Sequence, residues 1–326
     1  MTVHAVFGPV PSRRFGRSLG VDVIPRKLCT LDCVYCEVGR TDKRGLARRA
    51  YIPTELIVRE LREALLAHPD VECVTFSGSG EPTLHEGLGD LIRTAKGLTA
   101  VPVVVLTNGT LLWREDVRRD LLQADIVCPS LDAVSEDVFR RIDRPHPRLS
   151  AAEIIEGQVA FRREFTGKIW LEILFVQGMN DHDEEVSLLR AAIERINPDK
   201  VQINTVVRPP AEPWAHPVPQ DRLEAIRAML GPHAEIIVPT RERSCAPAPL
   251  PTDDEIISVV ARRPMSAIDV ATGLGADPGA VGRRLDALCS SGRLRIVEFS
   301  GKRFYALPES TVSEILGSTS ESERRN

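Results

Sequence analysis

Residues 29–36 read Cys-Thr-Leu-Asp-Cys-Val-Tyr-Cys, which places three of the chain's seven cysteines in a C-x3-C-x2-C spacing. Thiolates are soft ligands that suit iron–sulfur clusters or zinc. A [4Fe-4S] cluster takes one protein ligand per iron, so three cysteines leave one iron free for another molecule. A structural zinc site needs four ligands and usually a second close pair of cysteines or histidines, which the sequence lacks. We therefore predict that Cys29, Cys33 and Cys36 hold an iron–sulfur cluster.

The overall composition is that of a globular protein of moderate size. The chain has 326 residues, 43% of them hydrophobic and 27% charged, enough for one large α/β domain and a small second one. Its formal net charge of −4 argues against a general binder of polyanions. The odd number and uneven spacing of the cysteines differ from a secreted disulfide framework. Because no signal peptide or membrane-spanning pattern is visible, we expect a cytoplasmic protein without a membrane association.

Short apolar runs alternate with amphipathic segments over the first 240 residues. The segment that begins at Thr54 carries leucines and an isoleucine at helical spacing behind a threonine cap. Six repeats of strand and helix predict an α/β fold with a parallel sheet and helical crossovers. On pattern alone, a partial (β/α)6 barrel and a doubly wound sheet both fit. The expected strands are residues 21–24, 74–76, 101–106, 125–128, 169–176 and 201–207.

Polar stretches follow the ends of these runs. Residues 77–82 follow the second run, 107–109 the third, 130–132 the fourth and 177–181 the fifth, while the cysteine loop follows the first. Functional groups of a parallel barrel gather where its strands end, so the joint pattern predicts one shared mouth. Turn chemistry explains any single loop equally well. The cysteines favour the barrel.

The composition changes near residue 240. We expect a (β/α) barrel domain over residues 1–240, a proline-rich linker over 241–252, a small domain over 253–308 and a disordered tail over 309–326. The small domain shows three helical patterns and two strands around a Ser-Gly turn, which predicts a winged helix. Its third helix begins at Asp277 and Pro278, a suitable cap and first turn.

Residues 29–36 resemble the hallmark of the radical S-adenosylmethionine (SAM) superfamily, in which an aromatic residue, here Tyr35, precedes the last cysteine. Residues 79–82, Ser-Gly-Glu-Pro, resemble the superfamily's Gly-Gly-Glu motif, with Ser79 in place of the first glycine. Residues 107–109 and 130–132 resemble loops that contact the SAM ribose and carboxylate. The resemblance covers about residues 5–240 and implies the partial barrel. The opening residues resemble a subgroup related to the wyosine tRNA-modifying radical SAM enzymes.

The resemblance implies a chemistry and a set of residues. The amino and carboxylate groups of SAM bind the open iron of a [4Fe-4S] cluster, and an electron from the cluster cleaves SAM to methionine and a 5′-deoxyadenosyl radical. That radical abstracts hydrogen from a substrate. The metal ligands are Cys29, Cys33 and Cys36. The implied cofactor-binding residues are Tyr35, Ser79, Gly80, Glu81, Asn108, Ser130 and Asp132.

Glu172 lies inside the apolar run at 169–176, where a lone buried carboxylate is costly and needs a partner. If it points into the barrel, it is a further cofactor-binding candidate that meets the SAM ribose or the substrate. A salt bridge on the helix side is the alternative.

The first fifty residues are rich in arginine and lysine. Such a stretch beside a cluster suits a phosphate-bearing substrate, or a flavodoxin- or ferredoxin-like electron donor with an acidic face. A solvated surface is the simpler reading, and Arg13 and Arg14 could instead brace loops over the site.

We therefore expect a radical SAM enzyme whose substrate is unidentified, with RNA, a peptide, a protein and a small molecule all open. Wyosine synthesis itself is disfavoured, because that enzyme uses a second cluster on additional N-terminal cysteines and none precedes Cys29. The alternative is a DNA-binding regulator that senses redox state through its cluster and uses Arg283, Arg284 and Arg293 of the winged helix. Six βα units with a Gly-Glu-Pro loop favour the enzyme.

Overall fold

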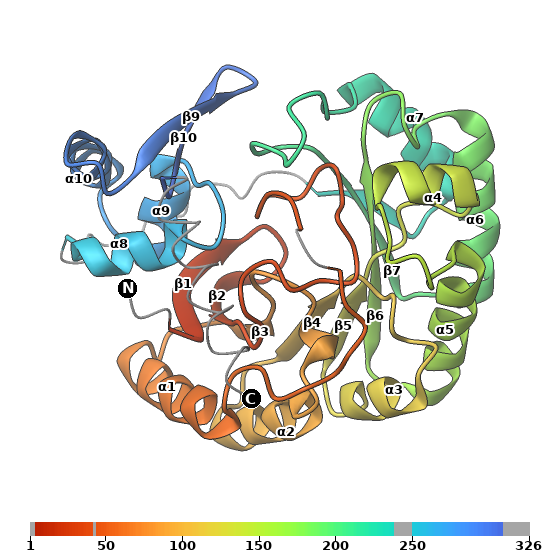
Figure 1. Ribbon diagram of the computed structural model, residues 1–326, viewed down its shortest axis with the longest axis horizontal. Helices are drawn as coiled ribbons and strands as arrows, with labels where there is room; N and C mark the ends of the chain where they lie inside the picture. The colour runs from red at the N-terminus through yellow and green to blue at the C-terminus, as the bar shows by residue number, and fades with distance from the viewer. Residues whose placement is uncertain (1–3, 42–43, 238–249, 309–326) are drawn as a thin grey trace.

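The computed structural model describes residues 4–41, 44–237 and 250–308. An eight-stranded sheet forms its centre, with the strands in chain order from β1 to β8 (Figure 1). The first two strands are antiparallel, and every later neighbour pairs in parallel. Within the described residues the two end strands do not pair, so the barrel is open. The strands are β1 (Val6–Ser12), β2 (Gly16–Val21), β3 (Cys73–Phe76), β4 (Val103–Thr107), β5 (Ile126–Pro129), β6 (Lys168–Phe175), β7 (Lys200–Thr205) and β8 (Ala234–Ile236).

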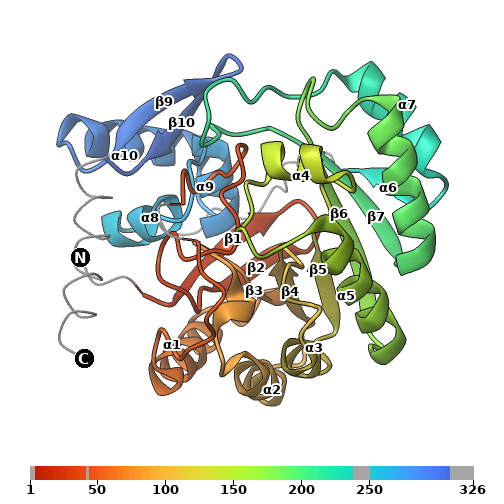
Figure 2. The same ribbon diagram turned by 45° about the vertical axis from the view of Figure 1, so that its right-hand side comes forward.

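Helices between the strands cover the convex side of this sheet (Figures 1 and 2). None of the described helices is long and apolar enough to cross a membrane. The helices are α1 (Thr54–Ala67), α2 (Leu88–Leu98), α3 (Glu115–Leu121), α4 (Glu136–Ile142), α5 (Ala151–Glu164), α6 (Asp183–Ile196) and α7 (Gln220–Leu230), with a 3-10 helix, η1 (Pro82–Leu84).

Side chains alternate between the two faces of the sheet, as the period of a strand requires. In β4, Val103 and Val105 pack with α1, α2 and α3 in the main hydrophobic core. Val104 points to the opposite face and packs with Cys73 and Cys128. One face of each strand therefore builds the core, and the other is left to line the interior of the barrel.

The predicted α/β fold with a mostly parallel sheet is confirmed, and the six expected strands correspond to β2–β7. The first lies earlier than predicted, at Gly16–Val21 instead of 21–24. Two strands were missed. β1 contains Pro9 and Pro11, which argue against a strand in sequence but are tolerated at a sheet edge. β8 has three residues, too few to leave a pattern.

The C-terminal described residues form three helices and a hairpin: α8 (Asp253–Val260), α9 (Ala267–Leu274), α10 (Pro278–Ser290), β9 (Arg295–Phe299) and β10 (Lys302–Ala306). This C-terminal unit has its own hydrophobic core. The Asp277 carboxylate caps α10 by accepting the Ala280 amide at 2.7 Å, and Pro278 opens the helix, as expected. Most of the predicted linker and all of the predicted tail lie outside the described residues.

The C-terminal unit packs against the edge strand β1 (Figure 2). A Cβ on Gly273 of α9 would lie 2.6 Å from the Pro11 ring, so only glycine allows this approach. Arg262 makes an ion pair with buried Asp22 at 3.2 Å and lies over the Phe7 ring. These contacts fix the segment after α8 beside the open end of the barrel.

Two helical glycines provide a test of the packing. A Cβ on Gly157 of α5 would lie 2.4 Å from the backbone nitrogen of Trp113, whereas one on Gly97 of α2 would meet nothing within 4 Å. We expect Gly157→Ala to lower the free energy of unfolding by about 1–3 kcal/mol, because the Trp113 backbone cannot shift to admit a methyl group without an energetic cost. Gly97→Ala should raise it by about 0.5–1 kcal/mol through helix propensity alone. Urea titrations of both variants measure the difference, and equal effects would contradict the packing.

Candidate active site

A cavity of about 320 Å³ opens where the parallel strands end. Its walls come from β1 and β2 and from the ends of β3, β4 and β5, which is the shared mouth that the strand-end pattern predicts. The volume is within the range of small-molecule sites. Six of the predicted metal- and cofactor-binding residues line it, and so do Arg13 and Arg14: the six are Cys29, Gly80, Glu81, Asn108, Ser130 and Glu172.

The three cysteines lie on one loop after β2, and all are free thiols. The Cys36 amide donates to the Cys33 carbonyl at 3.1 Å, which turns the loop tightly between them. Burial raises the pKa of Cys29 to about 12, with Glu81 adding to the shift, and burial also raises the pKa of Cys33. Metal coordination deprotonates such thiols. No three described His, Cys, Asp or Glu side chains converge on a single ion. In a [4Fe-4S] cluster each thiolate binds a different iron. The three cysteines therefore fit a cluster better than a single metal ion.

Lys27 lies beside the cysteine loop with its ammonium group buried and without a hydrogen-bond partner. Its backbone is left-handed, at φ 68°, and its amide donates to the Ser79 carbonyl at 2.9 Å. Burial lowers the pKa of Lys27, and negative charge at Cys36 opposes that shift. Because an unpaired buried cation is costly, Lys27 fits a site that holds an anionic cluster.

Glu81 is buried at the start of η1. One of its oxygens accepts hydrogen bonds from the Thr83 and Thr107 hydroxyls, both at 2.6 Å, and the other accepts the Asn108 amide at 2.7 Å. Among the described residues, no cationic side chain forms an ion pair with it, and burial raises its pKa. A carboxylate that hydrogen bonds hold in place, but that has no cationic partner, is suited to bind the ammonium group of a ligand.

The chain passes very close to itself at Gly80. A Cβ there would lie 2.0 Å from the Leu28 carbonyl oxygen, which accepts the Glu81 amide at 3.0 Å. The preceding Ser79 does not line the cavity: its hydroxyl donates to Asp22 at 2.7 Å. Glycine is therefore needed to bring Glu81 next to the cysteine loop.

Asn108 connects the end of β4 to the cysteine loop. Its side-chain amide donates to the Thr30 hydroxyl at 2.8 Å and lies 3.5 Å from the Cys29 sulfur. Ser130, at the end of β5, lines the cavity beside it. Asn108 thus presents a polar group next to the first cysteine, and Ser130 lines the same cavity.

Glu172 points into the barrel. Its carboxylate pairs with Arg14 at 2.6 Å and accepts the Asn204 side-chain amide at 2.9 Å. Burial alone would raise the pKa of Glu172, but Arg14 and Asn204 hold it below its ordinary value. Of the two sequence alternatives, the inward orientation is the one in the structure.

Tyr35 and Asp132 do not line the cavity. The Tyr35 hydroxyl donates to the Asp132 carboxylate, which also accepts the Leu174 amide at 2.7 Å. Asp143 lies 3.4 Å from the same hydroxyl. Burial raises the pKa of Asp132 to about 7 and raises that of Asp143 too. In this structure the group supports the cysteine loop, and direct contact of Tyr35 or Asp132 with SAM stays a prediction.

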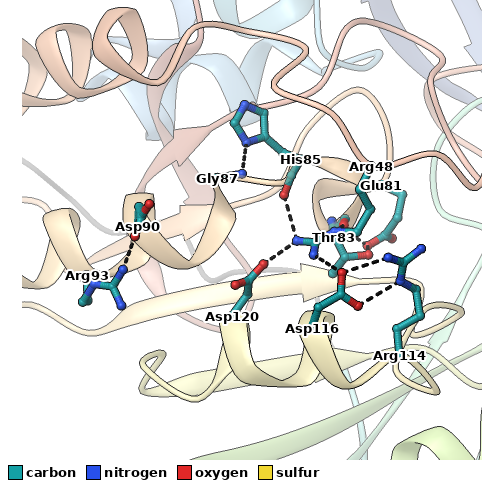
Figure 3. A network of polar contacts seen from close by, with 10 residues as sticks. All are labelled: Arg48, Glu81, Thr83, His85, Gly87, Asp90, Arg93, Arg114, Asp116 and Asp120. Carbon is teal, nitrogen blue, oxygen red and sulfur yellow. Dashed lines mark hydrogen bonds and ion pairs between the residues drawn. The ribbon is translucent and has the colours of Figure 1, made fainter.

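Arg48 ties the segment after the cysteine loop to the site (Figure 3). Its guanidinium donates to the Thr83 carbonyl of η1 at 2.9 Å and pairs with Asp116, at 2.7 Å, and with Asp120, both of α3. The Arg48 side chain is only 8% exposed. It therefore holds η1, and the adjacent Glu81, against α3.

Sequence reasoning missed four charged residues that line the cavity: Glu37, Arg208, Arg262 and Arg263. Arg208 lies beyond the end of β7, so applying the strand-end rule to one more strand would have found it. Arg263 lies between α8 and α9, and only the packing of the C-terminal unit on β1 brings it to the mouth.

Comparisons with known proteins agree with this geometry. A family model described as "Radical SAM superfamily" matches residues 23–189. The chain is 33% identical over 307 residues to a UPF0026 protein of Helicobacter pylori, covering 92% of this chain and 96% of that protein. It is 36% identical over 305 residues to a Brachyspira hyodysenteriae protein named GTPase Obg. That match covers 93% of this chain but 45% of the relative, so the chain spans less than half of that relative's length.

A solved structure of a radical SAM methyltransferase from Sphaerobacter thermophilus is similar in fold. Its TM-score is 0.52 at 21% identity, and the match covers 67% of this chain and 66% of that chain. Similarity at this level of identity concerns the fold alone.

Two arginines in Figure 3 make a matched test of the Arg48 contacts. We expect Arg48→Met to lower the free energy of unfolding by about 2–4 kcal/mol, because it leaves Asp120 and the Thr83 and His85 carbonyls without their donor, although Asp116 keeps Arg114. Arg93→Met removes an exposed pair with Asp90 and should cost less than about 1 kcal/mol. Chemical denaturation of the two variants measures both values, and similar losses would show that Arg48 is not a structural anchor.

Proposed function

The chain belongs to the radical SAM superfamily and to the UPF0026 proteins, and on that premise we propose that its cysteine loop and Gly80-Glu81 loop form one radical SAM active site. Enzymes of this superfamily use a [4Fe-4S] cluster and SAM. When bound, these supply a 5′-deoxyadenosyl radical that abstracts hydrogen from a substrate. The observation that carries the proposal is that Cys29 and Glu81 line the same cavity. Cys29 offers a soft thiolate ligand, and Glu81 offers a carboxylate that has no ion-pair partner among the described residues.

In this proposal Cys29, Cys33 and Cys36 are the three cluster ligands, and the fourth iron is left to SAM. Lys27 balances part of the negative charge of the thiolates, since its ammonium group is buried beside them without another partner. Tyr35 acts indirectly, by holding the loop through Asp132.

Glu81 binds the SAM ammonium group, and the Thr83, Thr107 and Asn108 donors fix its orientation. Asn108, which lies next to Cys29, and Ser130, which lines the same cavity, orient the rest of the cofactor. Glu172 offers a carboxylate that Arg14 already neutralises, which suits hydrogen bonds from ribose or substrate hydroxyls. Ser79 and Asp132 act by positioning the loops.

We also propose that the C-terminal unit is a winged-helix module that serves docking or substrate holding. Its basic residues are largely paired: Arg284 lies 2.5 Å and Arg293 2.9 Å from the Asp253 carboxylate. Since α9 packs on β1, the module faces the barrel. A role as a redox-sensing DNA-binding regulator has no comparable support.

An external reductant, of flavodoxin or ferredoxin class, is proposed to deliver the electron, because the four remaining cysteines are scattered through the sequence and provide no second cluster motif. The substrate is unidentified, and RNA stays one candidate. A cytoplasmic location and the relation to the wyosine enzymes also stay predictions.

The first test of this function removes one ligand. Anaerobically reconstituted protein incubated with SAM and dithionite should form 5′-deoxyadenosine. Cys33→Ala should lose both the cluster absorbance and this product, because a cube held by two thiolates is not retained. Cys289→Ala, in the C-terminal unit, is the control and should keep both. A full-strength, SAM-responsive cluster in Cys33→Ala would refute the ligand assignment.

The second test concerns Glu81. We expect Glu81→Gln to weaken SAM binding about 10- to 100-fold while leaving cluster assembly intact, because a charge-assisted hydrogen bond becomes a neutral one. Glu86→Gln, on the exposed part of the same loop, should leave the affinity unchanged. Equilibrium dialysis under anaerobic conditions measures both.

The pH dependence of SAM binding tests whether the charge of Glu81 contributes to the affinity. Burial raises the pKa of Glu81, so its proton is taken up at a higher pH than for an ordinary carboxyl group. Only the ionised form attracts an ammonium group, so wild-type affinity should fall as the pH is lowered through that raised pKa. The Gln variant should lack this step. An identical step in both proteins would remove Glu81 from the site.

A further inference from the structure

Positive charge gathers at the cavity mouth from three distant parts of the chain. Arg13 lies in the turn between β1 and β2, Arg208 lies after β7, and Arg263 lies between α8 and α9. All three line the same cavity as Cys29 and Glu81. We call Arg13, Arg208 and Arg263 the arginine cluster. Arg13 and Arg208 come from the open sheet and Arg263 from the C-terminal unit, which lies beside the sheet (Figure 2).

The acids within reach do not balance this cluster. Arg208 donates to Glu37 at 3.1 Å, and Arg263 approaches the same carboxylate at 3.6 Å, so two guanidinium groups share one acid. Asp269 lies 3.5 Å from Arg208. Arg13 donates instead to the neutral side chain of Asn204, at 2.9 Å. Three cations therefore face two carboxylates.

Nearby charges do not remove the excess. Glu172 is already paired with Arg14. None of the three arginines forms an ion pair with Glu81 within the described residues. The arginines are crowded enough that Arg208 is the main cause that lowers the pKa of Arg263 to about 10, with burial second. Like charges brought this close are costly unless a ligand of opposite charge joins them.

Donor capacity is also left over. Arg208 is 7% exposed, and its Nε is buried without a hydrogen-bond partner. A guanidinium presents a planar fork of donors that matches the oxygens of a carboxylate or phosphate. One buried and two half-buried guanidinium groups that line one cavity form a receptor for an oxyanion rather than a solvated surface.

We infer that the arginine cluster is a substrate subsite that binds an oxyanion group, a phosphate or a carboxylate, on the molecule that donates hydrogen in this cavity. The inference rests on the proposed function, because it assigns the part of the cavity that Glu81 and the cysteines do not use. The acid of Glu81 and the arginine cluster give the cavity two poles of opposite charge. An anionic substrate is drawn to one pole and the SAM ammonium group to the other.

Isothermal titration calorimetry of the full-length, cluster-loaded protein, with inorganic phosphate and with glutarate as ligands, tests this subsite. The variants are Arg13→Gln and Arg263→Gln; Arg208 is more deeply buried and risks misfolding. Each should weaken anion binding about tenfold or more, because a charge-assisted donor is lost. Arg293→Gln, on the surface of the C-terminal unit, is the control and should bind as the wild type does. Saturable binding of phosphate or of glutarate identifies which oxyanion the subsite prefers.

SAM affinity is measured in the same samples to separate this inference from the proposed function. Anion binding that depends on Arg13 and Arg263 supports the subsite even if SAM is not cleaved. Two results would overturn it. The first is no saturable binding of either anion, or equal binding by wild type and both variants. The second is competition between phosphate and SAM together with weaker SAM binding by Arg263→Gln, which would assign the arginines to the SAM carboxylate.

Discussion

The carbonyl of Leu28 accepts the Glu81 amide, and this single contact sets the geometry of the site. It brings the loop after β3 against the loop after β2 so closely that no side chain fits on Gly80. The carbonyl belongs to the residue before Cys29, so the contact also fixes the distance between the first thiol and the buried acid. The parallel sheet makes it possible, because neighbouring parallel strands end at the same edge.

Around that contact, buried charges fall into two kinds. Some are satisfied within the protein: Glu172 has Arg14, Asp22 has Arg262, and Asp116 and Asp120 share Arg48. Others lack a partner of opposite charge, as Lys27 and Glu81 do. Satisfied pairs hold the loops in place. The unsatisfied groups are where a ligand gains most, because its own charge removes an existing cost.

Much of the fold could be predicted because local patterns report it. Strands β3–β7 appear as apolar runs, and the start of α10 appears as an Asp-Pro pair. The site was predictable as far as its residues belong to short local motifs, as the cysteines and Glu81 do on their two loops. Arg263 was missed because only tertiary packing brings it to the mouth, whereas Arg208 was missed because the strand-end rule was not extended to β7. Ser79 and Asp132 show the converse: adjacency in a motif does not tell which way a side chain points, and here both bond to neighbouring protein groups.

An open barrel leaves strand edges where a closed one has none, and an unpaired edge is a template on which another chain can add a strand. At β1 two features remove that template. Pro9 and Pro11 have no amide hydrogens to offer, and α9 rests on the strand through Gly273. The C-terminal unit therefore does more than complete a cavity: it also shields the β1 edge of the open barrel from edge-to-edge association.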